Sequence, residues 1–303
     1  RYMKIICVLV TYNRIDKLKT ALKSYVNQTT LPDKMIVVDN HSNDGTIEFL
    51  NEWCEINHGF EKELIFLPNN TGGSGGFYAG LKKALEYDSD WIYISDDDAY
   101  LDDDVIEKIK RYATSTDDNV GAICATVKEN DGLGYYHRRV IKEGVLGIKE
   151  KNLPDTDYNR KCVELSTYSF VGTAIRTSSL WNIGLPNKDF FLWYDDTEHG
   201  IRMGKRYKIL FYPDIVVKHD VDSANTGVNW KKYYGYRNNL LSIKYNYNIR
   251  YFKNKIMMLR ISMLRDYLIP ARRPLIEMKK QAIKDAKNNK LGISEVYYPG
   301  AKL

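Results

Sequence analysis

Three consecutive aspartates, Asp96, Asp97 and Asp98, follow the apolar segment 91–95 of this 303-residue chain. Adjacent carboxylates repel one another and resist burial. A divalent cation would relieve that repulsion, and carboxylates are suitable ligands for Mn²⁺ or Mg²⁺, which complete their coordination with substrate phosphate oxygens. The competing interpretation is an acidic turn that caps a helix beginning near Leu101, since Asp102–Asp104 has the same character.

A second pair of carboxylates, Asp195 and Asp196, follows the aromatic segment 190–194. A carboxylate beside aromatic walls is a candidate general base, because partial desolvation raises its proton affinity. Aromatic faces also suit the apolar faces of sugar rings. The alternative is a core strand followed by a capping aspartate, since residues 198–204 have a helical pattern.

Two further segments have residue types that suit a ligand site. Residues 69–76 are rich in Asn and Gly, which permits close approach of the backbone to a ligand, and they lead into a helix over 77–87 whose amino end favours anions. The segment lacks the Lys of a P-loop and a clean dinucleotide motif, so a flexible loop is the alternative. His219 follows the apolar residues 215–217 and could complete a metal site, although an isolated histidine is more often structural.

The elements that must position these residues alternate between strand and helix patterns. We expect strands at 4–10, 35–38, 64–67 and 91–95, separated by helices at 15–27, from 44, and at 77–87. This order is typical of a parallel sheet covered on both faces, in which ligands bind at the carboxyl ends of the strands. The polar residues after these strands should therefore meet in one crevice.

The remainder of the chain has a different character. We expect strands at 121–127 and 168–176 around a long polar segment, 130–160, and helices beyond residue 230. Residues 231–290 contain 16 Lys and Arg against 3 Asp and Glu, whereas residues 1–230 contain 28 basic and 35 acidic residues, a balance of −7. The basic region, which is also rich in tyrosine, fits either solvated helices packed on the first domain or binding to an anionic membrane surface. We expect no nucleic-acid partner, because no nucleic-acid motif is present and the rest of the chain is acidic.

Composition and cysteine use indicate a cytoplasmic protein. The chain is 44% hydrophobic, which is enough for a large core, and its four cysteines form no CxxC or Cys/His cluster. No apolar run approaches the roughly 18–20 residues that span a bilayer, and no signal peptide is recognisable. We therefore expect a cytoplasmic location, with peripheral contact to the inner face of the cell membrane as an option.

Taken together, these motifs resemble the inverting family-2 glycosyltransferases of GT-A fold. The resemblance rests on five ordered motifs and covers about residues 4–240. These are residues 10–14, residues 38–46, the Asn- and Gly-rich segment, the aspartate triplet, and residues 193–196 with His219. The glycine-rich segment and the Asp-Asp-x-Glu-His-Gly sequence look closest to bacterial galactofuranosyltransferases, with rhamnosyltransferases as near relatives. The resemblance implies a Rossmann-like α/β domain at 1–228, with a nucleotide-binding half at about 1–100 and an acceptor half at about 101–228. A basic helical region follows at 229–303.

The resemblance also implies roles for single residues, with a nucleotide-sugar donor, UDP-linked in the first instance. Donor-binding residues would be Thr11, Asn13, Arg14, Asp39, Asn69, Asn70, Gly73 and Asp97. Asp96, Asp98 and His219 would bind Mn²⁺ or Mg²⁺. Asp196 would be the base, with Asp195 as its alternative, and the acceptor site would contain Trp193, Tyr194, Asp195 and His199.

The expected reaction transfers a sugar, galactofuranose from UDP-galactofuranose, to a glycan or a polyprenyl-diphosphate-linked glycan in bacterial surface polysaccharide synthesis. Two alternatives remain open: a rhamnosyltransferase using dTDP-rhamnose, and a sugar nucleotidyltransferase. The second alternative is disfavoured because residues 11–14 lack a glycine-rich, basic loop. The polymerising mycobacterial galactofuranosyltransferases are much longer, so processive polymerisation is not implied.

Overall fold

The computed structural model describes residues 3–130, 132–145, 147–221 and 227–302. Its centre is a mixed sheet whose main path runs β10-β13-β6-β12-β4-β1-β2-β3. Six strands point the same way: β1 (Ile5–Thr11), β2 (Lys34–Asp39), β3 (Glu61–Phe66), β4 (Trp91–Asp96), β6 (Val120–Glu129) and β13 (Lys208–His219). The other strands of this sheet are β5 (Ala99–Leu101), β7 (Gly132–Leu133), β10 (Val163–Leu165) and β12 (Thr173–Arg176), and each runs antiparallel to its partner. The expected mostly parallel α/β sheet is confirmed.

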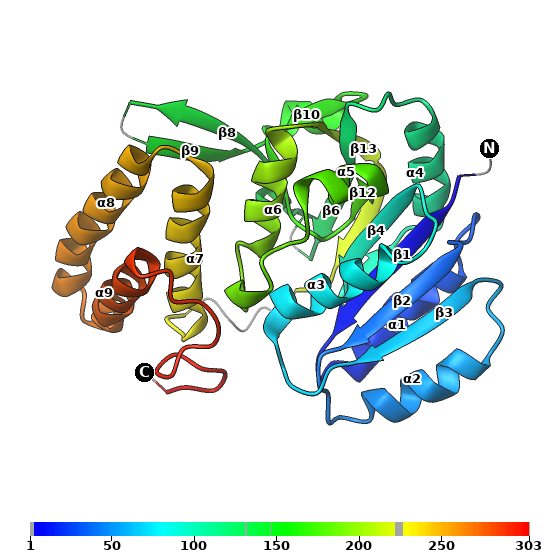
Figure 1. Ribbon diagram of the computed structural model, residues 1–303, viewed down its shortest axis with the longest axis horizontal. Helices are drawn as coiled ribbons and strands as arrows, with labels where there is room; N and C mark the ends of the chain where they lie inside the picture. Colours follow the sequence, from blue (N-terminus) through cyan, green and yellow to red (C-terminus); the bar gives the residue numbers. More distant parts are fainter. Residues whose placement is uncertain (1–2, 131, 146, 222–226, 303) are drawn as a thin grey trace.

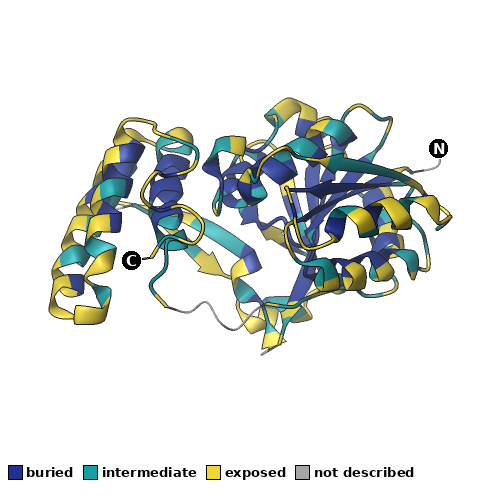
Figure 2. Cartoon of the chain, turned by 90° about the horizontal axis from the view of Figure 1, so that it is seen from below, coloured by how far each residue is buried: buried dark blue, intermediate teal, exposed yellow. Residues whose placement is uncertain are grey.

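Helices cover both faces of this sheet (Figure 1). α1 (Ile15–Val26), α2 (Thr46–Glu55) and α4 (Val105–Thr114) pack on one face, while α3 (Gly72–Ala84), α5 (Thr177–Ile183) and α6 (Asp195–Gly204) pack on the other. Every residue of β1 is buried, as expected for a strand with an uninterrupted apolar sequence. The buried residues form the layer between the exposed helix faces in Figure 2.

A small second sheet and three helices complete the molecule. β8 (Arg138–Gly144) pairs with β9 (Gly147–Asn152) and with β11 (Thr167–Tyr168), so the polar segment 130–160 contains a hairpin. The expected helices beyond residue 230 are α7 (Lys231–Asn246), α8 (Ile249–Leu268) and α9 (Pro274–Lys287). Phe190 shares a buried cluster with residues of α7 and α9, so this bundle packs directly on the sheet domain. Within the described ranges, none of the helices has the length and apolar character needed to span a bilayer.

Three local predictions were wrong. The helix expected from Phe77 begins at Gly72, because Gly76 and Gly80 let α3 lie against β1: a Cβ on Gly76 would lie 2.5 Å from Val10 Cγ1. The strand expected at 168–176 is interrupted around Gly172, whose φ is +67°. Leu101 ends the short strand β5, and the following helix begins only at Val105.

His199 lies inside the domain, within α6. Its side chain is completely buried, with Nδ1 2.8 Å from the Tyr168 hydroxyl and Nε2 3.0 Å from the Gly184 carbonyl oxygen. Burial, and then the charge of Arg202, lower the pKa of His199 from its ordinary 6.5 to about 3. This histidine is therefore neutral in the folded protein and links α6 to its neighbours.

We expect His199 to make stability depend on pH. Between about pH 6.5 and pH 3 the unfolded chain binds a proton at this residue and the folded chain does not, so stability is lost as the pH falls. Protonation of this group in the unfolded chain lowers the free energy of unfolding by up to about 1.4 kcal/mol per pH unit. His199→Gln keeps an acceptor and a donor without a titrating ring, and urea unfolding at pH 7.5, 6.0 and 5.0 should show a shallower pH dependence than in the parent. Identical slopes for the two proteins would contradict the assignment.

Candidate active site

Five parallel strands end on a polar residue at the same edge of the sheet. The last residues of β1, β2, β4, β6 and β13 are Thr11, Asp39, Asp96, Glu129 and His219. Pairing of His219 with Ala99 of β5 brings the end of β13 beside the aspartate triplet. The polar residues expected to meet at the strand ends therefore lie along one edge of the sheet, and Glu129 lies there with them.

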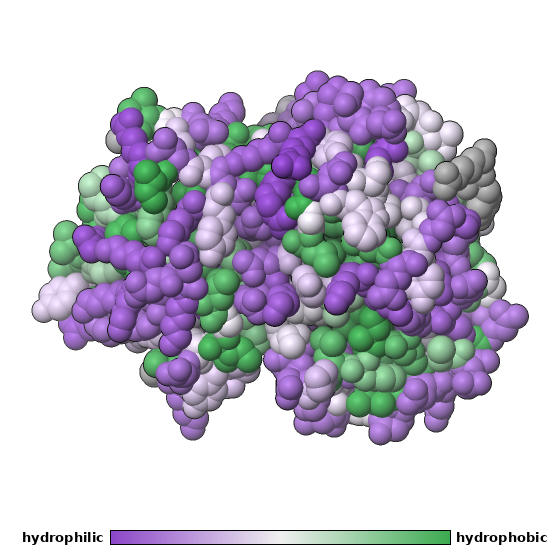
Figure 3. All heavy atoms as spheres, viewed as in Figure 1, coloured by the Kyte–Doolittle hydropathy of each residue, from purple (hydrophilic) through white to green (hydrophobic). Residues whose placement is uncertain are grey.

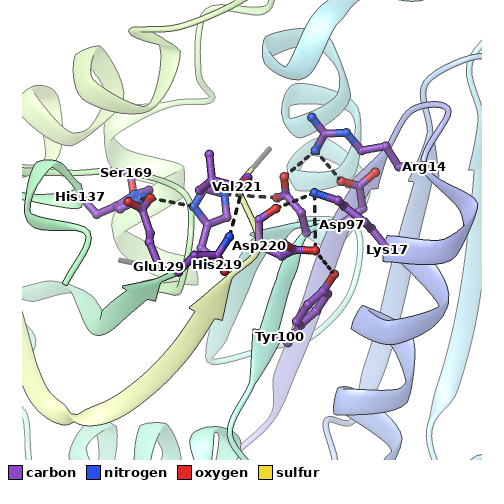
Figure 4. A network of polar contacts seen from close by, with 12 residues as sticks. Arg14, Lys17, Asp97, Tyr100, Glu129, His137, Ser169, His219, Asp220 and Val221 are labelled. Atoms are coloured by element: carbon purple, nitrogen blue, oxygen red, sulfur yellow. Dashed lines mark hydrogen bonds and ion pairs between the residues drawn. The ribbon is translucent and has the colours of Figure 1, made fainter. Parts of the chain in front are cut away.

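A chain of polar contacts runs along this edge (Figure 4). Arg14 Nη1 lies 2.5 Å from Asp98 Oδ2 and 3.2 Å from Asp97 Oδ1, while His219 Nε2 lies 3.2 Å from Asp98 Oδ1. On its other side, His219 Nδ1 lies 3.2 Å from Glu129 Oε1. The His219 ring is thus held between the carboxylate of Asp98, in the turn between β4 and β5, and that of Glu129, at the end of β6.

Glu129 also contacts a second histidine, His137, at 3.3 Å, and His137 Nδ1 lies 2.6 Å from Ser169 Oγ. Hydrogen bonding from His137 lowers the pKa of Glu129 to about 2, and burial lowers the pKa of His137 to about 4. Burial works against a charged His219, but its contact with Asp98 prevails and raises the pKa of His219 to about 9. Glu129 is therefore a charged acceptor for both rings.

The three aspartates have different surroundings. Asp97 is buried and accepts hydrogen bonds from Thr11 Oγ1 at 2.8 Å and from the Tyr12 amide at 3.3 Å. Burial raises its pKa to about 6 despite the nearby Arg14. Burial and then the charge of Asp98 raise the pKa of Asp96. The Asp97 carboxylate therefore holds the end of β1 through its bonds to Thr11 and Tyr12, and it is not exposed at the surface.

The donor set at Asp98 and His219 suits a divalent cation. Asp98 Oδ1 is buried and, apart from its ion pair with His219 Nε2, has no hydrogen-bond partner among the described residues. A carboxylate oxygen opposite an imidazole nitrogen, beside the further carboxylate of Asp96, offers ligands of the type that Mn²⁺ uses. Glu129, His137 and His219 also form a group whose ligand atoms all lie within 4.8 Å of one another. Because Glu129 lies at hydrogen-bonding distance from both rings, we regard it as the residue that orients His219.

The residues expected to bind the nucleotide lie at the ends of β1 and β2. Asp39 is fully buried, and its Oδ1 has no donor among the described residues, whereas Oδ2 accepts from the Ser42 amide at 3.1 Å. Asn13 has a φ of 51°, and its Oδ1 accepts from the Asn43 amide at 2.8 Å. Asp39 Oδ1 is therefore the acceptor in this region that lacks a partner.

The asparagines before α3 differ in exposure. Asn70 Oδ1 accepts from the Gly72 amide at 2.8 Å and from Asn40 Nδ2 at 3.2 Å, so it closes the turn into α3. Asn69 is exposed, and Gly73 is half-buried with open space where a Cβ would stand. Asn70 thus closes the turn into α3, while Asn69 and Gly73 keep surface that a ligand could contact.

The aromatic segment 190–194 has an unusual backbone. Phe191, Trp193 and Tyr194 have φ values of 66°, 64° and 67°, in the left-handed region that non-glycine residues rarely adopt. The amino end of α3 packs against it so closely that a Cβ on Gly72 would lie 1.9 Å from the Phe191 carbonyl oxygen. The start of α3 and the start of α6 are therefore neighbours.

Residues of α7 hold this segment in place. Asn238 Nδ2 lies 2.9 Å from the carbonyl oxygens of Phe190 and Leu192 and 3.0 Å from that of Trp193. Arg237 Nη2 donates to the Phe190 carbonyl at 3.0 Å, and Nη1 donates to the Gly292 carbonyl at 2.7 Å. Both side chains are buried, so these bonds fix the backbone that leads into α6.

Asp195 and Asp196 begin α6, where the amino end of the helix favours negative charge. Asp196 Oδ1 accepts from the amide and the hydroxyl of Thr197. Burial raises the pKa of Asp196 and the nearby Arg139 opposes it; burial and the charge of Asp196 raise the pKa of Asp195. The charge of Asp96 also raises the pKa of Asp195, so the two carboxylates are near enough to interact electrostatically.

The residues expected to contact an acceptor differ in exposure and position. Trp193 is 40% exposed, whereas Tyr194 lines a pocket of about 260 Å³ between the β8–β9 hairpin, α6, α7 and α8. The polar lining of this pocket includes Glu150, Asn239 and Lys255. His199 is not brought to this surface, as its complete burial shows.

Three residues beside the site were missed from the sequence. Glu129 ends a buried strand, which is the same signal that identified the aspartates, but the apolar pattern that predicted this strand ends at Val127. His137 and Arg139 lie in the polar segment, and no local pattern marked them. Arg139 donates to Thr197 Oγ1 at 2.7 Å and pairs with Glu150, which places its charge next to Asp196.

Comparisons with known proteins agree with this geometry. The family model described as glycosyl transferase family 2 matches residues 6–184. Galactofuranosyltransferase GlfT1 of Mycobacterium tuberculosis H37Rv is 27% identical over 199 residues, which are 64% of this chain and 62% of that protein. This chain thus covers less than two thirds of that relative. The uncharacterized glycosyltransferase YwdF of Bacillus subtilis is 28% identical over 238 residues, or 76% of this chain and 81% of YwdF.

Solved structures of similar fold include two nucleotide complexes. S. aureus TarS 1–349 in complex with UDP has a TM-score of 0.59 at 16% identity, covering 95% of this chain and 92% of that chain. GalNAc-T7 with UDP, GalNAc and Mn²⁺ has a TM-score of 0.66 at 14% identity, covering 94% of this chain and 56% of that chain. At these identities the likeness concerns the fold, which is that of GT-A glycosyltransferases. The chain therefore belongs to glycosyl transferase family 2 and has the GT-A fold.

Proposed function

We propose that this protein is an inverting, metal-dependent glycosyltransferase that moves galactofuranose from UDP-galactofuranose to a glycan or lipid-linked glycan acceptor. The observation that carries the proposal is the proximity of two acidic groups: Asp96 and Asp98 with His219 at one edge of the sheet, and Asp195 with Asp196 at the start of α6, where the Asp195 carboxylate interacts electrostatically with Asp96. The first group suits a nucleotide-sugar diphosphate with its cation, and the second suits activation of an acceptor hydroxyl. The choice of galactofuranose is supported by the names of the relatives that the chain resembles.

Binding of the donor would use the β1 and β2 ends. Asp39 Oδ1, buried and without a donor among the described residues, is our candidate acceptor for the imide N–H of a uracil base. Asn13, Asn69 and Gly73 are proposed to contact the same donor. In this proposal Thr11 and Asp97 act as positioning residues, since they bond to each other, and Arg14 holds Asp98.

The transfer itself needs a base and an in-line path. Asp196 accepts the proton of the acceptor hydroxyl, whose oxygen attacks the anomeric carbon from the face opposite the diphosphate. The bond between the anomeric carbon and the diphosphate oxygen breaks, UDP leaves, and an α-linked donor yields a β-linked product. A divalent cation held by Asp96, Asp98 and His219 would offset the charge that develops on the departing diphosphate.

The acceptor is proposed to approach along Trp193 and the pocket that Tyr194 lines. An aromatic wall with Glu150, Asn239 and Lys255 combines apolar and hydrogen-bonding surface, which suits one sugar unit. If the glycan is carried on a polyprenyl diphosphate, the protein works at the inner face of the cell membrane.

Turnover of the purified protein with four donors tests this function. With Mn²⁺ present, release of nucleoside diphosphate from UDP-galactofuranose should exceed by at least about tenfold that from UDP-galactopyranose, UDP-glucose and dTDP-rhamnose, because pocket contacts discriminate sugars by one or more kcal/mol. Excess chelator should abolish release. A preference for dTDP-rhamnose would reassign the donor, and activity only with a nucleoside triphosphate would replace transfer by nucleotidyl chemistry.

Asp196→Asn should lower transfer by about 10²–10⁴-fold, because the amide cannot accept the acceptor proton. Calorimetric affinity for the donor should change less than about twofold, since the residue lies at the start of α6 and not at the strand ends. Asp195→Asn is the matched control and should retain measurable transfer. Loss of transfer in the Asp195 variant, with the Asp196 variant still active, would exchange the two roles.

Glu129→Gln should weaken binding of Mn²⁺ about 10–100-fold, because His219 loses the charged acceptor that orients its ring. His219→Ala should weaken binding more strongly. Titration of Mn²⁺ followed by electron paramagnetic resonance measures this without donor or turnover. Glu63→Gln, which removes a half-buried carboxylate hydrogen-bonded to Tyr87, should bind Mn²⁺ like the parent. Unchanged affinity in both His219→Ala and Glu129→Gln would move the metal elsewhere.

A further inference from the structure

α8 carries an apolar stripe that the rest of the described chain leaves exposed. Met257, Ile261, Leu264 and Leu268 are 51%, 59%, 71% and 77% exposed. Their spacing of four, three and four residues places them on one side of the helix. The opposite side of α8 is covered, since Phe252 and Ile256 belong to the buried cluster shared with α7 and α9. The stripe is therefore a continuous face rather than scattered exposure.

Cations border this stripe. Four exposed cations of α8 are Arg250, Lys253, Arg260 and Arg265, while its acidic residue, Asp266, is buried in an ion pair with Lys279. Hydrophobic and strongly hydrophilic residues lie side by side over the end of the molecule that α8 forms (Figures 1 and 3). An exposed apolar stripe flanked by Lys and Arg is the pattern of a helix that lies in the plane of a membrane interface.

A pocket beside the stripe adds a second observation. Between α8 and α9 lies a hollow of about 490 Å³ lined by Arg260, Lys280, Lys284 and Lys287, with Met263 and Ile283 among its apolar walls. Lys280 pairs with the exposed Glu277, and no acid pairs with the other three cations in the part of the chain that the structure describes. Four cations around a partly apolar hollow suit a phosphate group attached to an acyl chain.

We propose that the face formed by α8 and α9 binds the surface of an anionic membrane, with the apolar stripe at the boundary of the acyl chains and a lipid headgroup in the α8–α9 pocket. Charge decides between this occupant and a second copy of the chain. In a symmetric dimer through this face, the Arg and Lys residues of one copy would approach those of the other. An anionic bilayer meets both the cations and the apolar stripe.

The membrane contact itself does not depend on the proposed function. Only its consequence, access to a lipid-linked acceptor, rests on that function. α7 connects the two regions: it packs against α8 and α9 and also holds the segment that leads to Asp195 and Asp196. A protein docked through α8 would therefore keep its candidate active site at a fixed distance from the membrane. The contact itself is tested without donor, acceptor or metal.

Vesicle flotation of the full chain provides the test. The protein should bind vesicles of phosphatidylcholine with about 30% phosphatidylglycerol at least about tenfold more tightly than vesicles of phosphatidylcholine alone. Binding should weaken when NaCl is raised from about 0.1 to 0.5 M, because screening shortens the reach of the cations. Equal binding to both vesicles, or none to either, would overturn the proposal.

Two pairs of variants separate the stripe from the pocket. Ile261→Gln with Leu264→Gln removes apolar surface, and Arg260→Glu with Lys284→Glu reverses charge at the pocket; each should lower vesicle affinity at least about tenfold. Ile56→Gln is the control for the first, because Ile56 is also exposed, and Lys23→Glu with Lys82→Glu is the control for the second. Circular dichroism should show all of them folded.

The outcomes separate this inference from the proposed function. Parent-like vesicle binding by both test variants would overturn the membrane face even if sugar transfer is found. A parent dimer in solution that Leu264→Gln converts to a monomer, without anionic vesicle binding, would assign the stripe to a second copy. Vesicle binding by a protein with no transferase activity would leave this face established and remove the proposed reaction.

Discussion

The hydrogen bonds from Asn238 and Arg237 to the backbone of residues 190–193 are the constraint on which the candidate active site depends. Three residues of this segment and its boundary are left-handed, and each such residue costs of order 1–3 kcal/mol. Buried hydrogen bonds from α7, together with the burial of Phe190 and Phe191, offset that cost. The resulting turn sets the direction in which α6 starts, and therefore where Asp195 and Asp196 lie.

This arrangement joins two parts of the chain that differ in composition. Residues 1–230, which are acidic overall, contain the strand ends and the carboxylates. Arg237 and Asn238, whose side chains hold the backbone of residues 190–193, come from α7, the first helix of the basic region. A boundary at residues 228 and 229 remains a prediction, and residues 222–226, which precede it, lie outside the described part of the chain. The contacts of Phe190 with α7 and α9 show that the site is completed by both parts. Removing α7–α9 would leave the backbone carbonyls of Phe190, Leu192 and Trp193 without these hydrogen-bond donors.

Much of the fold and the position of the site could be predicted from the sequence because strand patterns are local. The uninterrupted apolar runs of β1 and β4, each followed by polar residues, indicated a parallel sheet with a crevice at its edge. The start of α3 was misplaced, because glycine is a poor helix former and its role here is close packing on Val8 and Val10. The left-handed backbone at Phe191, Trp193 and Tyr194 could not be predicted, since aromatic residues give no local signal for it and the partners lie about 45 residues away in sequence. The same reason hid Glu129 and His137, whose significance depends on a contact with His219 some 80–90 residues later.

The basic and acidic parts of the sequence form different parts of the folded molecule. The net +13 of residues 231–290 is concentrated in helices packed at one end, while the −7 of residues 1–230 belongs to the sheet domain. Near an anionic surface, such a distribution attracts one end and repels the other within about 8–10 Å, the screening length at physiological salt. Charge alone would therefore orient the molecule before any apolar residue of α8 makes contact. Since α7 is fixed both to α8 and to the turn before α6, that orientation extends to the crevice, so the composition of the C-terminal region and the geometry of the site are parts of one arrangement.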